Sequence, residues 1–214
     1  MDGEILQESL IKNPNWAVEQ FTRWINNGGR LVSSSSPVAQ LSDQFNPATF
    51  EGLGEGWTIW KGLVDGKGLE GELEVYEPAD LKELNASDML FEHFLIDNPD
   101  PKNREDVIAG ETKLDRVKGS KKILLGGRSF LALLNDYRGN KENSALEWLR
   151  KNRGVTWMDF PGLLLRYPDG YRCMLYLYFH GEIWDWHCIW LGLDWYRGYP
   201  SALLASIKKQ SLDS

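Results

Sequence analysis

The chain has 214 residues, of which 42% are hydrophobic and 26% charged, and its formal net charge is −7. This balance is typical of a globular protein with one large or two small domains, and no run of about 18 apolar residues predicts a membrane span. Two cysteines and an acidic start without a signal-peptide pattern exclude a disulfide scaffold and lead us to expect a cytoplasmic protein.

The first half of the chain combines helical patterns with one predicted hairpin. Aromatic and aliphatic residues recur at helical spacing over 14–27, and the segments 33–45 and 78–97 also have the patterns of short helices. Alternation punctuated by glycine over 56–78 predicts a hairpin with one solvated acidic face. Residues 97–106 are polar and contain two prolines, so this segment is the candidate for a domain seam or a mobile loop.

The second half changes from helices to strands. Residues 107–127 fit strands or irregular structure, and two short helices are expected over 129–140 and 142–154. Asp-Gly and His-Gly pairs break the apolar stretch 155–195 into an antiparallel meander, and 200–209 has the pattern of a final helix.

These elements predict one α+β domain that covers residues 1–214. In this fold the antiparallel sheet of 155–195 packs on one face against helices that include 14–27 and 200–209. The tryptophan-rich face of the sheet supplies the core.

The turns of the meander also predict a register. If Asp169–Gly170 and His180–Gly181 are two-residue loops, Cys173 lies opposite Cys188 on the core face, with Cα atoms about 5.5 Å apart. That spacing permits a disulfide, but a bridge at such a hydrogen-bonded pair is strained, so we favour two buried thiols.

The opposite face of the meander collects the chain's chemically useful side chains. In the predicted register these are Tyr167, Arg172, Met174, Tyr176, Tyr178, Asp185 and His187.

Two interpretations of this face remain open. Asp185 can orient the imidazole of His187, and Tyr176 and Arg172 could then take part in general acid–base chemistry, as in a hydrolase-like enzyme. No G-x-S-x-G motif or other nucleophile supports such an enzyme. The favoured interpretation is a binding domain that uses an aromatic-lined pocket or this sheet face, including Tyr178, Tyr167 and Met174, for a small ligand or a protein partner.

A metal site at the hairpin is not favoured. His180 falls in the turn, Glu182 on the core face and His187 on the opposite face, so their side chains do not converge as zinc or iron ligands must. We expect neither a metal nor a cofactor.

The basic segment 113–153 gives a further alternative, the binding of an anion or a nucleic acid. Arg128 follows two glycines before a predicted helix, where free N–H groups could hold an anion. A structural turn capped by Ser129 is favoured, because no P-loop motif is present. The few aromatic residues nearby are not interleaved with the cations, so a nucleic-acid partner is not favoured.

Overall fold

The computed structural model of the chain describes residues 36–205 except 42, 43 and 63. The predicted helix 14–27 lies outside these residues. The main sheet has the strand order β4-β11-β7-β8-β9, with β2 paired to β7 and β6 paired to β11. Its strands are β2 (Thr58–Ile59), β4 (Met89–Glu92), β6 (Ile123–Leu124), β7 (Trp157–Arg166), β8 (Arg172–His180), β9 (Ile183–Trp190) and β11 (Ser201–Leu204). All pairs are antiparallel except β11 with β7.

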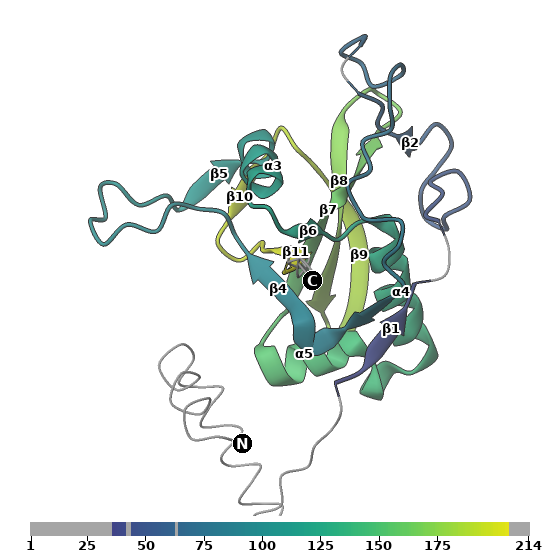
Figure 1. Cartoon of the computed structure of the whole chain (residues 1–214), viewed down its shortest axis with the longest axis vertical. Coiled ribbons are helices and arrows are strands. Elements are labelled where there is room, and N and C mark those ends of the chain that lie inside the picture. Colours follow the sequence, from purple (N-terminus) through teal and green to yellow (C-terminus); the bar gives the residue numbers. More distant parts are fainter. Residues whose placement is uncertain (1–35, 42–43, 63, 206–214) are drawn as a thin grey trace, which may run out of the picture.

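Short elements complete the described part of the chain, as Figure 1 shows. They are the pairs β1 (Val38–Gln40) with β3 (Glu83–Asn85) and β5 (Val107–Ala109) with β10 (Asp194–Tyr196), the 3-10 turns η1 (Ala86–Asp88) and η2 (Lys141–Asn143), and the helices α3 (Gly110–Gly119), α4 (Gly127–Gly139) and α5 (Ala145–Arg153). The protein therefore has the predicted α+β fold with a C-terminal meander β7-β8-β9.

Helices cover both faces of the meander. Leu165, Leu175 and Leu177 join the larger core cluster, to which α4 and α5 contribute. On the other face, Leu164 and Met174 pack in a second cluster with residues of α3, β5 and β10. Helix α3 is the element that the sequence did not indicate, since strands or irregular structure were predicted for 107–127.

Local sequence signals explain the two helices that were predicted correctly. In α5, the Ser144 side chain accepts a hydrogen bond from the Glu147 N–H, and Gly154 closes the helix in the left-handed conformation at φ 67°. The apolar side of α4 contributes Phe130, Leu133 and Leu134 to the core.

Three predicted helical segments are wrong where the structure describes them. Residues within 33–45 form β1, those within 78–97 form β3 and β4, and those within 200–209 form β11. Strands β4 and β11 pair with each other over four residues, so distant partners override their local helical patterns. The predicted hairpin 56–78 is reduced to β2 and two isolated bridges.

The observed register of β8 and β9 differs from the prediction by two residues. The turn is Gly181–Glu182, with φ angles of 56° and 72°, and Tyr176 pairs with His187. A shift of two residues keeps every side chain on its predicted face but changes its partner. Cys173 therefore pairs with Trp190 and Cys188 with Leu175, and both thiols are free.

The register of β7 and β8 differs in a more consequential way. Near the turn Leu164, not Leu165, pairs with Met174, because the loop has three residues and ends at Gly170 with φ 93°. A bulge between Asp159 and Leu164 then shifts the pairing again. As a result Asp159 lies opposite Tyr176, on the face where chemistry was expected.

Candidate functional site

Aromatic side chains from several strands meet on one face of the sheet, at the end that α3, β5 and β10 do not cover. We call this surface the aromatic face, and it consists of Trp157, Tyr176, Tyr178, His187, Tyr196 and Tyr199. Trp157 comes from β7, Tyr176 and Tyr178 from β8, and His187 from β9. Cross-strand neighbours on one face lie close enough for rings to touch, so the register itself builds this surface.

The rings of the aromatic face form a continuous stack. Trp157 lies between Tyr176, with centroids 3.9 Å apart, and Tyr199, with centroids 4.3 Å apart. His187 extends the stack beyond Tyr176 at 6.0 Å. Burial raises the pKa of Tyr176 to about 12, so its phenol stays protonated at neutral pH. Trp157, Tyr176, Tyr178 and Tyr199 are half-buried, and His187 is exposed.

Asp185 borders the aromatic face next to His187, but the two side chains do not form a hydrogen-bonded pair. The Asp185 carboxylate accepts the N–H of Trp186 at 2.8 Å, and His187 Nδ1 accepts the N–H of Cys188 at 2.7 Å. Strand β9 ends the main path of the sheet, so these N–H groups point away from β8. The two side chains therefore cap backbone donors of an edge strand.

Arg172 lies far along β8 from this face and is committed to two acids. Its guanidinium donates to Glu74 and to Glu111 at 2.9 Å each, and it sits 5.3 Å from the centroid of the Trp60 ring. With a side-chain exposure of 17%, Arg172 joins β8 to α3 and to the segment before β3. Arg172 therefore lies at the opposite end of β8 from Tyr176 and Tyr178 and is held there by these acids.

The remaining predicted ligand-binding residues of the meander are also dispersed. Met174 is 1% exposed and belongs to the cluster under α3. Tyr167 lies at the β7–β8 loop, where its ring contacts Trp57 and Tyr171 at centroid distances of 4.8 and 6.5 Å. Of the predicted site, the structure brings together only Tyr176, Tyr178, Asp185 and His187.

An internal carboxylate occupies the start of α4, where an anion was considered. Glu77 accepts the backbone N–H groups of Gly126, Arg128 and Ser129 at 3.0 Å each, and also the hydroxyl of Ser129. The Arg128 guanidinium donates to three backbone carbonyls, those of Pro78, Ala79 and Leu81. The favoured prediction of a structural turn fits this geometry, but the cap is Glu77 and not Ser129.

Most cations of the basic segment 113–153 have acidic or carbonyl partners within the fold. Salt bridges join Arg116 to Glu105, Lys118 to Glu74, Lys122 to Glu92, and Arg150 and Lys151 to Glu147. The positive charge of this segment is thus largely compensated by acids of the fold.

Sequence reasoning missed a buried ion pair beneath α3. Lys113 Nζ lies 2.5 Å from Asp159 Oδ2 and 2.5 Å from the carbonyl oxygen of Tyr199, and the two side chains are 1% and 0% exposed. Burial lowers the pKa of Lys113 and raises that of Asp159, and their mutual attraction opposes both shifts. The Ser201 side chain also acts on Asp159 and opposes the rise of its pKa.

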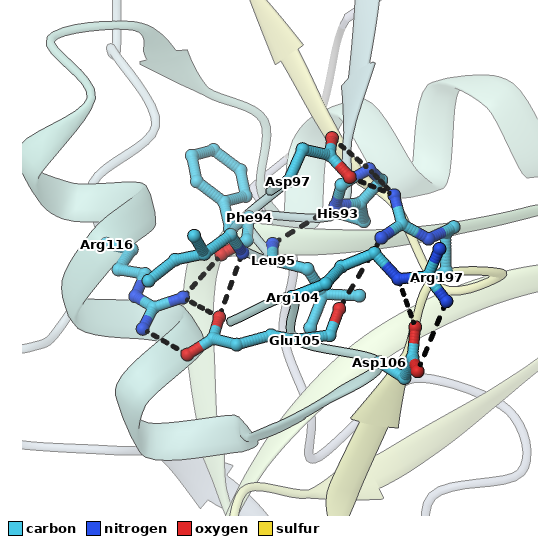
Figure 2. A network of polar contacts seen from close by, with 10 residues as sticks. His93, Phe94, Leu95, Asp97, Arg104, Glu105, Asp106, Arg116 and Arg197 are labelled. Atoms are coloured by element: carbon cyan, nitrogen blue, oxygen red, sulfur yellow. Dashed lines mark hydrogen bonds and ion pairs between the residues drawn. The ribbon is translucent and has the colours of Figure 1, made fainter. Parts of the chain in front are cut away.

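A second polar network was also missed, and it surrounds His93, the first histidine of the chain (Figure 2). His93 Nδ1 accepts the Leu95 N–H, and its Nε2 lies 3.0 Å from Arg197, which donates to Asp97 at 2.7 Å. Burial first, and then Arg197, lowers the pKa of His93.

Glu105 connects the same network to α3. Its carboxylate accepts from both terminal nitrogens of Arg116 and from the Ile96 N–H (Figure 2). The Arg116 hydrogen bonds, followed by the Ile96 N–H, lower the pKa of Glu105 to about 2. The network thereby fastens both ends of the polar loop 97–106 to the body of the protein. Only the acidic and basic composition of this loop hinted at it.

The described residues contain no group of three or more His, Cys, Asp or Glu side chains placed to hold a metal ion, and no helix in that part of the chain is long and apolar enough to cross a membrane. Comparisons of the chain with protein-family models, with curated proteins and with solved structures find no match.

Proposed function

We propose that the protein is a binding domain that engages a protein partner through its aromatic face. The observation that carries this proposal is the unbroken stack from His187 through Tyr176 and Trp157 to Tyr199, built on three neighbouring strands and the segment after β10. Tyrosine and tryptophan are enriched among residues that dominate protein–protein binding energy, because they offer large rigid area and a polar group.

The geometry favours binding over catalysis. Asp185 and His187 accept hydrogen bonds from neighbouring backbone N–H groups, and Arg172 donates to Glu74 and Glu111. Two cavities of the described part of the chain, of about 350 and 280 Å³, are lined by residues outside the aromatic face. A protein surface can lie across a sheet face, whereas a small-molecule site is typically concave.

Photo-crosslinking at a single position tests the proposal. A benzophenone side chain replaces the half-buried Tyr178 in the full chain, and Tyr76, which is 38% exposed and lies outside the aromatic face, serves as the control position. We expect a protein adduct of constant mass from position 178 but not from position 76, in cells that naturally contain the chain.

Competition makes the result specific. An excess of unmodified chain should suppress the adduct, whereas a folded Tyr176→Ala, Tyr178→Ala variant should compete at least tenfold less well, since each truncation of a central aromatic costs about 2 kcal/mol. Equal adducts at both positions, or equal competition by the variant, would rule out this face as the binding surface.

A further inference from the structure

An apolar groove lies at the start of α4, on the side of the sheet opposite the aromatic face. It has a volume of about 350 Å³, within the range of about 300–1,000 Å³ that small-molecule sites occupy. Phe45, Ile59, Leu73, Val75 and Leu163 form its apolar walls. Leu163 and Phe45 belong to the larger core cluster, so the floor of the groove is continuous with the core.

Part of this apolar wall is uncovered. Leu73 and Val75 are 51% and 44% exposed, although their alternation with acids is typical of positions that face a core. The backbone of this segment is held by the isolated bridges of Leu73 with Lys61 and Val75 with Leu163, and by hydrogen bonds to Trp60, Gly62 and Gly162. These two neighbouring aliphatic side chains therefore offer apolar surface at the mouth of the groove.

Some charged side chains that line the groove already have partners within the protein, and, among the described residues, one does not. Four donors at the start of α4 satisfy Glu77, and backbone carbonyls take the guanidinium of Arg128. Within the residues that the structure describes, Lys82 lines the groove and its ammonium makes no hydrogen bond or ion pair. One free cation therefore stands beside an exposed apolar wall.

We propose that this groove binds a small amphiphile with an aliphatic chain and a terminal carboxylate. The chain lies against Leu73, Val75 and Leu163, where it removes apolar surface from water, and the carboxylate pairs with Lys82. Glu77 does not repel the ligand strongly, because its charge is compensated by the donors of α4. The site is independent of the aromatic face, so either proposal can fail without the other.

Calorimetric titration with octanoate and with octanol tests the site, because the two probes share a chain and differ in charge. We expect octanoate to bind more tightly than octanol to the wild-type chain. Lys82→Gln should weaken octanoate binding about tenfold and leave octanol binding unchanged, since it removes the cation and keeps the length. Lys67→Gln, at an exposed lysine that does not line the groove, is the matched control and should bind both probes like the wild type.

A second variant separates the apolar contribution from folding defects. Leu73→Asp changes an exposed side chain, so the protein should keep its wild-type unfolding temperature while both probes bind at least tenfold more weakly. The proposal is overturned if octanoate does not bind the wild type, if Lys82→Gln binds it as tightly as Lys67→Gln does, or if Leu73→Asp binds both probes normally.

Discussion

Polar side chains on the two halves of one sheet face differ in their burial and in their partners. Under α3, β5 and β10, Asp159 is fully buried and is paired with Lys113. At the open end, Asp185 is exposed and bonds only to the backbone of the next residue. Both acids project from the same face of the same meander. The difference teaches that the covering elements, and not the strand pattern, decide which polar groups must find a charged partner.

Tyr199 marks the boundary between these halves. Its carbonyl oxygen accepts a hydrogen bond from the buried Lys113, whereas its ring stacks on Trp157 in the aromatic face. The buried ion pair thus helps to hold one end of the proposed binding surface.

The largest expected effect is at the covered half. Lys113→Met should lower the free energy of unfolding by about 3–5 kcal/mol, because it leaves the carboxylate of Asp159 buried without its cation. The Lys113→Met, Asp159→Leu double variant should recover most of that loss, since an apolar pair replaces a buried ion pair at little net cost. Urea denaturation of both variants measures the difference. Equal losses in the single and double variants would contradict the assignment.

A smaller effect should depend on pH through His93, at the rim of the covered half. Because its pKa in the folded protein lies below 6.5, the unfolded chain binds the proton more tightly. The stability that neutral His93 contributes is therefore complete above pH 6.5 and is lost as the pH falls from there through the folded-state pKa.

The comparison with His93→Gln isolates this contribution. Between about pH 8 and about pH 5 the wild type should lose more stability than the variant, and Glu105, with a pKa of about 2, stays ionised throughout. Parallel stability curves for the two proteins would exclude His93 as the titrating group.

The smallest expected effect is at the open half. Asp185→Ala and His187→Ala should each change the unfolding free energy by less than about 1 kcal/mol, because water can replace a cap on an exposed strand edge. Their double variant should be additive within about 0.5 kcal/mol, in contrast to the strong coupling of Lys113 with Asp159. A clearly larger coupling between Asp185 and His187 would restore them as an interacting pair.

Helix caps and the alternation of side chains along a strand predicted the parts of the fold that depend on neighbouring residues in the sequence. Helix α5 carries its own caps at Ser144 and Gly154, and the faces of β8 and β9 were correct because a two-residue error preserves the side-chain period. The predictions for β4 and β11 were wrong, because each strand pairs with a strand more than a hundred residues away in the sequence.

The candidate site was predictable only in part, for related reasons. Helix α3 was missed because a lysine, Lys113, occupies its buried stripe beside Leu114 and Val117 and hides the apolar periodicity. Without α3 the sequence could not show that Arg172 and Met174 are covered. The bulge after Asp159 was equally hidden, so the partner of Lys113 could not be recognised.

The capping of β9 has a consequence for crowded solutions. An edge strand of eight residues with three tryptophans is a template on which another chain could add a strand and begin to aggregate. Here the N–H groups of Trp184, Trp186 and Cys188 are already bound by Tyr137, Asp185 and His187. A partner strand would first have to displace these side chains, and two of them, Asp185 and His187, protect the edge against amyloid-like growth while adding little to the stability of the single molecule.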